Sequence, residues 1–168
     1  MDKEAELAAR FWKKLKSDRT VMLGLAGIED GHSQPMTAQV EDEDEGNGPV
    51  WFFSAKDTDF VKQLGEGRRA VAHFAAKDHE LFASLDGALV PFNDRATIDR
   101  LWNPFVAAWY PGGKDDPKLQ LLRMNPDRVQ VWLNDSGVLA GVKLLLGRDP
   151  KKDYAGKVAD VNLPPRTG

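Results

Sequence analysis

Residues 69–92 have the sequence RAVAHFAAKDHELFASLDGALVPF, which predicts two β-strands joined by a short polar turn. In the second strand, Leu81, Ala83 and Leu85 occupy alternate positions, so their side chains lie on one face of a sheet. This alternation is typical of a strand that packs one face on a core. We therefore expect these residues to build part of a β-sheet core.

More strand-like segments flank this region. Residues 50–55, VWFFSA, are rich in residues that favour strands, and residues 127–133, DRVQVWL, alternate apolar and polar positions. Two further strand candidates lie earlier in the chain, at residues 21–27 and 33–40. The acidic run at residues 41–45 is closed by GNGP and predicts a solvated hairpin loop.

Helical periodicity appears at the N-terminus and after the aromatic strand. Residues 2–17 predict an amphipathic helix, because large apolar residues repeat at every fourth position from Leu7 to Leu15. A short second helix is expected after Asp57 or Thr58, either of which can cap it, and a glycine ends it.

Two later segments are also helix candidates. Residues 93–102, NDRATIDRLW, begin with cap residues and predict a third helix. The apolar residues at helical spacing are Ile98, Leu101, Trp102 and Phe105. Residues 138–147, VLAGVKLLLG, suit a strand or a helix, and we favour a short helix.

Many short strands with a few helices indicate an α+β domain with a β-barrel or sandwich core. Strands and helices do not alternate regularly, which argues against a doubly wound parallel sheet. Periodicity leaves barrel and sandwich open. We expect one domain over residues 1–168, with its N-terminal helix inside residues 1–18 and a loosely held tail at residues 149–168, where apolar residues are few.

The composition excludes several classes of protein. Hydrophobic residues make up 42% and charged residues 29%, as in globular domains, and the absence of cysteine excludes disulfides and thiol chemistry. A net charge of −3 argues against nucleic acid as a partner. No apolar stretch approaches the ~20 residues of a membrane span, and the N-terminus lacks the apolar core of a signal peptide. We expect a cytoplasmic protein.

Several familiar motifs fail on inspection. The sequence GEGRRA at residues 65–70 follows a predicted helix and precedes a predicted strand, the reverse of the order that a dinucleotide fingerprint requires. The acidic run lacks the ligand spacing of a calcium loop. The three histidines are too scattered for a metal site, and no G-x-S-x-G elbow exists. The sequence therefore shows no residues arranged for hydrolysis or for metal binding.

Two segments leave a functional role open. Residues 56–59, KDTD, lie at a predicted strand-to-helix junction, where free N–H groups, the Thr58 hydroxyl and the Lys56 ammonium offer a seat for phosphate. Plain helix capping is the alternative. Residues 102–110 gather four aromatic side chains, which suit core packing, a flat wall for a ligand, or a dimer surface.

Three segments together resemble a known family. They are PMTAQV (residues 35–40), WFFSAKDTD (residues 51–59) and DRATIDRLWNPFVAAWYPGGKDDPKLQLLRM (residues 94–124). The chain is similar, from the first helix to about Gly147, to the general-stress-protein branch of the pyridoxamine 5′-phosphate oxidase-like, FMN-binding split barrels. The resemblance implies a six-stranded antiparallel Greek-key split β-barrel with peripheral helices. It also implies a homodimer with FMN at the subunit interface, and FAD as an alternative flavin.

The resemblance assigns roles to particular residues. Met36, Thr37 and Ala38 would pass beneath the flavin ring and give backbone hydrogen bonds to its polar edge. The other residues expected at the flavin are Phe53 and Ser54 at the end of the next strand, Thr58 and Lys56 at the phosphate, and Trp109 and Lys114 from the partner subunit.

Two departures from the family pattern limit what it implies. Phe60 stands where many members have a lysine, and losing a charge-assisted hydrogen bond costs roughly 1.5–3 kcal/mol, so we expect weaker flavin binding. The tail offers Arg166 but no motif that matches the substrate-binding residues of the true oxidases. Oxidation of pyridoxamine phosphate is therefore not implied.

The leading hypothesis is a flavin-binding protein of the general stress type, acting as a flavin reservoir or redox protein. One alternative is a flavin-dependent oxidoreductase on an unidentified small molecule, for which the flavin supplies the hydride chemistry. Another is a flavin-free dimeric module whose aromatic cluster binds a second protein.

Overall fold

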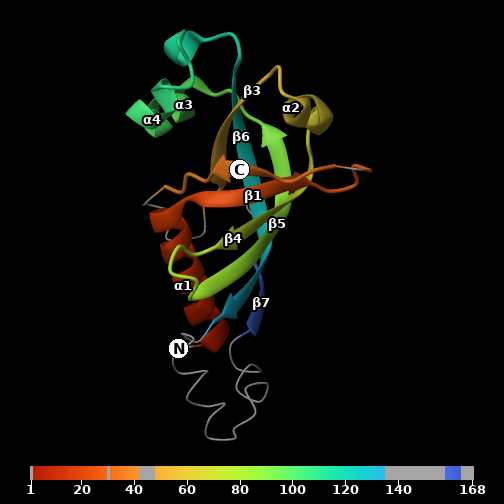
Figure 1. Cartoon of the computed structure of the whole chain (residues 1–168), viewed down its shortest axis with the longest axis vertical. Coiled ribbons are helices and arrows are strands. Elements are labelled where there is room, and N and C mark those ends of the chain that lie inside the picture. Colours follow the sequence, from red (N-terminus) through yellow and green to blue (C-terminus); the bar gives the residue numbers. More distant parts are fainter. Residues whose placement is uncertain (1, 30, 42–47, 135–157, 164–168) are drawn as a thin grey trace, which may run out of the picture.

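The structure, a computed structural model, describes residues 2–29, 31–41, 48–134 and 158–163. Its strands form one antiparallel sheet of seven strands with helices at the periphery (Figure 1). The strands are β1 (Thr20–Leu25), β2 (Gln34–Thr37), β3 (Val50–Ala55), β4 (Arg68–Ala75), β5 (Leu81–Pro91), β6 (Leu119–Leu133) and β7 (Val158–Asn162). The helices are α1 (Lys3–Asp18), α2 (Asp59–Leu64), α3 (Arg95–Leu101), α4 (Pro104–Ala107) and the 3₁₀ turn η2 (Gly113–Asp115).

The sheet curls into a barrel that is closed at one point. Six strands follow the order β2-β1-β4-β5-β6-β3, and Gln39, just after β2, pairs with Trp51 of β3. These two residues exchange backbone hydrogen bonds of 2.9 Å. Among the described residues β2 and β3 form no other pair, so the barrel is split between them. The predicted α+β split barrel is confirmed.

The β4–β5 hairpin shows the predicted alternation. Leu81, Ala83 and Leu85 are all buried, and Ala83 and Leu85 stand opposite Phe74 and Ala72 of β4. The same side of β6 contributes Val129 and Val131, which are fully buried. Alternate positions of three neighbouring strands therefore fill the barrel interior.

The longest strand, β6, joins two segments that the sequence predicted separately. It continues through Asn125 and Pro126, where the register with β5 shifts at Asp86 and Gly87. A Cβ atom on Gly87 would lie 2.2 Å from the carbonyl oxygen of Asn125. This bulge therefore needs a glycine, because the two backbones approach too closely for any side chain.

Helix α1 packs against the barrel through the predicted apolar face, which buries Leu7, Phe11 and Leu15. Asp2 caps its first turn. The helix ends at Arg19, whose φ of 66° is left-handed and whose N–H donates to the carbonyl of Leu15 at 2.8 Å. The chain can then enter β1 directly.

A second apolar cluster lies on the other face of β3. Trp51 belongs to this cluster, whereas its neighbours Val50 and Phe52 point into the barrel. Helices α3 and α4 contribute Ile98, Leu101 and Val106. Both faces of β3 are therefore covered, which explains why its sequence is continuously apolar rather than alternating.

The third predicted helix is shorter than expected. It ends at Leu101, and Asn103 then adopts an extended conformation (φ −150°, ψ 168°) before Pro104 begins α4. The residue before a proline avoids the helical conformation, which explains the break. Phe105 consequently leaves the apolar face on which the spacing placed it, and it is 81% exposed.

The end of the chain also differs from expectation. Residues 158–162, inside the segment predicted to be loosely held, form β7, which pairs with β6. Ala159 is buried and Val161 packs against the core, so these two alternate residues hold the strand in place. Most of the predicted acidic loop and the helix predicted at residues 138–147 lie outside the described residues.

Candidate functional site

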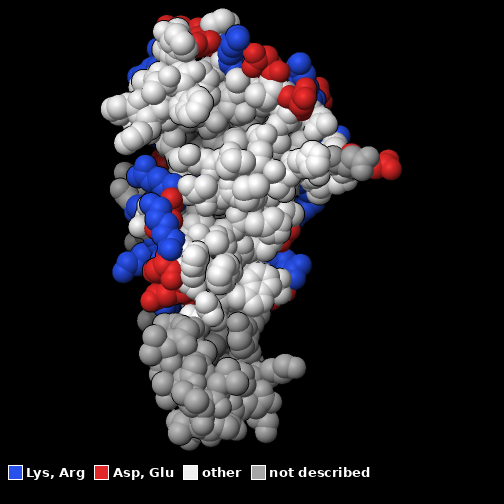
Figure 2. Space-filling model, in the orientation of Figure 1, with Lys and Arg blue, Asp and Glu red and all other residues white. Residues whose placement is uncertain are grey.

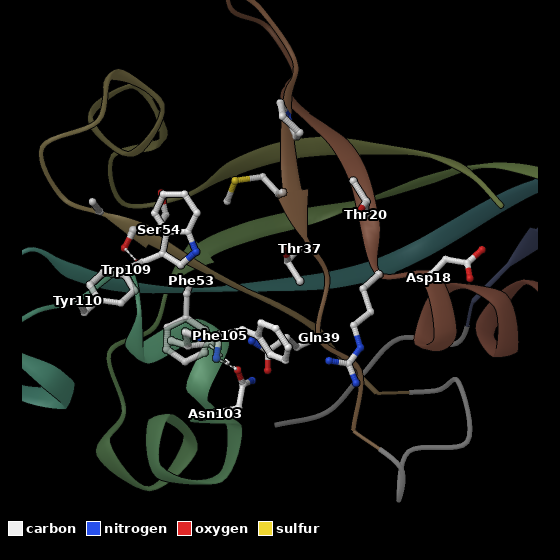
Figure 3. A pocket seen from close by; sticks show the side chains of 15 residues that line it. Asp18, Thr20, Thr37, Gln39, Phe53, Ser54, Asn103, Phe105, Trp109 and Tyr110 are labelled. Atoms are coloured by element: carbon white, nitrogen blue, oxygen red, sulfur yellow. Dashed lines mark hydrogen bonds between the residues drawn. The ribbon is translucent and has the colours of Figure 1, made fainter. Parts of the chain in front are cut away.

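A cleft of about 720 Å³ opens where the barrel is split, between β2 and β3. Its walls come from the start of β1, from β2, from the end of β3 and from the segment around α4 (Figure 3). In Figure 3, Ser54, Trp109 and Tyr110 lie on one side, Asp18 and Thr20 lie on the other, and Thr37 lies between them. The cleft is therefore a direct consequence of incomplete barrel closure.

Backbone groups line this split. The N–H of Ala38 donates to the carbonyl of Arg19 on the β1 side, and the N–H of Gln39 donates to Trp51 on the β3 side. Because successive residues of a strand point their N–H and C=O groups in opposite directions, those of Thr37 face the split. The same alternation on β3 turns the backbone of Phe53 towards β2. Facing strand edges thus offer donors and acceptors to a ligand.

The segment around α4 forms an aromatic wall. Asn103 caps α4, since its Oδ1 atom accepts hydrogen bonds of 3.0 Å from the N–H groups of Phe105 and Val106. Phe105 and Trp109 both line the cleft and are each 81% exposed. The surface over α4 is uncharged in Figure 2, whereas charged side chains gather over α1. A flat apolar ligand would cover much of this exposed aromatic surface.

Tyr110 anchors the wall to the barrel. Its hydroxyl donates to the carbonyl oxygen of Ser54 at 2.6 Å, and its ring contacts those of Phe53 and Trp102 at centroid distances of 6.4 and 6.2 Å. Burial raises the pKa of the Tyr110 hydroxyl to about 12. The hydroxyl therefore acts as a neutral donor at ordinary pH, and its role is to hold the wall in place.

Two charged residues border the cleft at its other side. The carboxylate of Asp18 accepts a hydrogen bond of 2.8 Å from the backbone N–H of Lys77. Arg19 is the only lysine or arginine among the described lining residues, and no ion pair to another described residue engages it. Within the same described part of the chain, no cluster of His, Asp and Glu has the geometry of a metal site.

Five of the residues that the resemblance pointed to line the cleft. They are Met36, Thr37, Phe53, Ser54 and Trp109. Trp109 was expected from the partner subunit but lies on the cleft of its own chain. Ala38 is buried beside the cleft, where its N–H is bonded to β1.

The other three predicted site residues lie away from the cleft lining. Thr58 caps α2, and its single O–H donor is bonded to the carbonyl of Ala55 at 2.8 Å. Lys114 pairs with Asp99 at 2.9 Å. Lys56 is exposed after the end of β3. A phosphate role for Thr58 stays a prediction, and it requires this hydroxyl to exchange partners.

Sequence reasoning missed the part played by Arg19, Gln39 and Asn103. No local signal distinguishes Arg19 from the other charged residues of the first helix, because its place in the cleft depends on where α1 meets β1. Asn103 carried a signal, since an asparagine before proline is a common start of a helix.

The family model described as "Pyridoxamine 5′-phosphate oxidase like" matches residues 6–149. A general stress family protein from Xanthomonas campestris has 58% sequence identity, with 81% of this chain and 92% of that chain covered and a TM-score of 0.75. The chain belongs to the pyridoxamine 5′-phosphate oxidase-like family. This membership confirms the resemblance on which the expected fold was based.

Two further solved structures are similar to this member of the pyridoxamine 5′-phosphate oxidase-like family. A general stress FMN/FAD binding protein from Xanthomonas citri is 57% identical over 79% of this chain and 92% of its own, with a TM-score of 0.73. General stress protein 26 from Jannaschia sp. is 30% identical over 95% and 99%, with a TM-score of 0.76. A search of curated proteins gives no match. In the described part of the chain, no helix has the length and apolar character needed to cross a membrane.

Proposed function

We propose that this protein binds a flavin mononucleotide in the cleft between β2 and β3. The observation that carries the proposal is that the split brings the free backbone edge at Thr37, the hydroxyl-bearing end of β3 and the exposed rings in and just after α4 into one cleft. A flavin needs a flat apolar wall, hydrogen bonds for its polar edge and a seat for its phosphate. The flavin bound by the relative from Xanthomonas citri supports the same choice.

The residues present fit such a ligand in a definite orientation. The ring would lie over Met36 and Thr37, with the exposed aromatic residues against its other side. The ribityl phosphate would extend past Ser54 and Ala55, towards the start of α2, where Lys56 and Thr58 lie just beyond the cleft. When bound, the flavin would supply redox chemistry, while the chain binds and orients it.

A second copy of the chain is part of the proposal. The outer face of β1, β4, β5 and β6 carries Met22 and Phe82, which are 43% and 38% exposed, around a hollow of about 560 Å³ that His73 and Trp132 also line. Exposed apolar side chains on a central sheet face are typical of an interface. Light scattering should show a dimer for the natural chain and a smaller species for Met22→Glu, with Lys62→Glu on α2 as the surface control.

Fluorescence titration with FMN tests the cleft. We expect saturable quenching of FMN emission at micromolar concentrations, and at least tenfold weaker binding for Trp109→Ala, with Lys62→Ala unchanged. Titrations with FAD and riboflavin alongside identify the preferred flavin. Failure to bind any of the three at high micromolar concentration would reject the proposal and favour a flavin-free interaction module.

A reservoir and an enzyme differ in what happens to the bound flavin. Phe105 and Trp109, the aromatic residues proposed to border the flavin ring, are largely exposed, so a second small molecule has access to the cleft. Bleaching of the bound flavin by NADH or NADPH, followed by reoxidation, would establish an oxidoreductase. Inertness towards both nicotinamides and oxygen would establish a reservoir.

A further inference from the structure

Arg19 has an unusual backbone conformation at the junction of α1 and β1. Its φ of 66° is left-handed, a conformation that is strained for any residue other than glycine. Two hydrogen bonds hold it there: its N–H donates to Leu15 at 2.8 Å, and its carbonyl accepts from Ala38 at 2.7 Å. The usual residue at this helix end is glycine, so the chain keeps an arginine at a position that disfavours it.

The strand register places Arg19 at one end of the cleft. Thr20 pairs with Thr37, and Gln39 pairs with Trp51, so Arg19 lies beside the closed end of the split. Ser54 and the end of β3 lie at the open end, two or more residues further along. Figure 3 agrees, because Asp18 and Thr20 lie on the side of Thr37 away from Ser54.

The guanidinium of Arg19 keeps most of its hydrogen-bonding capacity. Its Nε atom donates a long bond of 3.4 Å to the carbonyl of Lys16. Its Nη atoms make no hydrogen bond or ion pair to any described residue. The neighbouring carboxylate of Asp18 is bonded to the backbone of Lys77 instead. A guanidinium binds flat groups with oxygen and nitrogen acceptors through two parallel donors.

We propose that Arg19 binds the pyrimidine edge of the flavin ring and makes the protein hold reduced flavin more tightly than oxidised flavin. This inference rests on the proposed function and on its ring orientation. Two electrons and one proton added to the ring leave it with one extra negative charge, spread over the N1 and C2 carbonyl edge. A cation at that edge would stabilise the charged form selectively.

The charge on Arg19 can be tested through the potential of the bound flavin. Arg19→Gln removes the charge, Arg19→Lys keeps it, and Arg10→Gln on the exposed side of α1 is the matched control. The midpoint potential is measured with dithionite as reductant and a reference dye. We expect Arg19→Gln to lower the preference for reduced flavin at least tenfold, which is about 30 mV for a two-electron couple. The midpoint potential in Arg19→Lys should stay close to that in the natural chain, and the potential in Arg10→Gln should equal it.

The same variants locate the arginine along the ligand. If Arg19 binds the ring edge, Arg19→Gln should lower the affinities for FMN and for riboflavin by equal factors. A loss confined to FMN would place Arg19 at the phosphate and overturn the proposal, as would an unchanged potential in a variant that still binds flavin. Should Arg19→Gln not fold, Arg19→Met and the sensitivity of natural-chain binding to salt provide the comparison. If the natural chain binds neither flavin, the proposed function itself fails.

Discussion

The hydroxyl of Tyr110 donates a buried hydrogen bond of 2.6 Å to the carbonyl oxygen of Ser54. This bond joins the segment after α4 to the end of β3, although the two residues are 56 positions apart in the sequence. It therefore fixes the aromatic wall relative to the end of β3.

Replacing Tyr110 by phenylalanine removes this bond and keeps the ring. We expect the free energy of unfolding to fall by about 1 kcal/mol, the usual net value of one hydrogen bond, because the carbonyl of Ser54 also loses a partner. Urea denaturation followed by tryptophan fluorescence measures the change. Stability equal to that of the natural chain would show that the bond does not hold the wall.

The same residue makes stability depend on alkaline pH. The pKa of Tyr110 is raised to about 12 in the folded chain, against about 10 when unfolded, so the folded state keeps its proton longer. Its contribution is complete below pH 10 and is lost as the pH rises through 12, by about 2.7 kcal/mol at most. Thermal unfolding of Tyr110→Phe between pH 9 and pH 12 should show a shallower decline. Parallel curves would contradict the raised pKa.

The exposed rings of Phe105 in α4 and of Trp109 just after it should matter for the ligand and not for folding. Phe105 and Trp109 are each 81% exposed, so Phe105→Ala and Trp109→Ala should each change stability by less than about 0.5 kcal/mol. Flavin affinity should fall tenfold or more in each. The buried Trp12→Ala is the contrasting variant, since it should lower stability by several kcal/mol, about 3–5 for a buried aromatic residue. Large destabilisation by Phe105→Ala or Trp109→Ala would assign that ring to the core.

Two glycines allow steric clash to be separated from backbone strain. Gly87→Ala places a Cβ atom 2.2 Å from a backbone oxygen, and we expect a loss of at least about 3 kcal/mol or failure to fold. Gly65 has open space around it but a φ of 59° and a ψ of −129°, a conformation that only glycine adopts readily, so Gly65→Ala should cost about 1–3 kcal/mol from backbone strain alone. Chemical denaturation of both variants gives the comparison. Similar losses would mean that the β5–β6 bulge can relax.

The side-chain cap at the start of α2 should contribute measurably to the stability of the protein. The Thr58 hydroxyl accepts a bond of 3.2 Å from the N–H of Val61. Thr58→Ala should therefore cost about 1 kcal/mol, and Thr58→Ser should restore most of it. Thermal shifts of the two variants measure the difference. Equal shifts would show that the methyl group, and not the hydroxyl, stabilises the helix start.

Local patterns determined much of the fold. The alternation at Leu81, Ala83 and Leu85, the four-residue repeat of the first helix and the cap at Thr58 each depend on residues a few positions apart, and each appears in the structure. Family-specific segments added the split barrel and pointed to Met36, Thr37, Ser54 and Trp109, which the structure brings to one cleft.

Long-range contacts decided the rest. The bridge from Gln39 to Trp51 closes the barrel at one end and leaves the cleft at the other, and no local periodicity records that pairing. The place of Arg19 on the cleft, and the exposure of Phe105, likewise depend on how separate segments meet. Side-chain spacing specifies helices and strands because neighbours along the chain share one backbone geometry. A binding site gathers residues that the chain keeps apart until its core has formed.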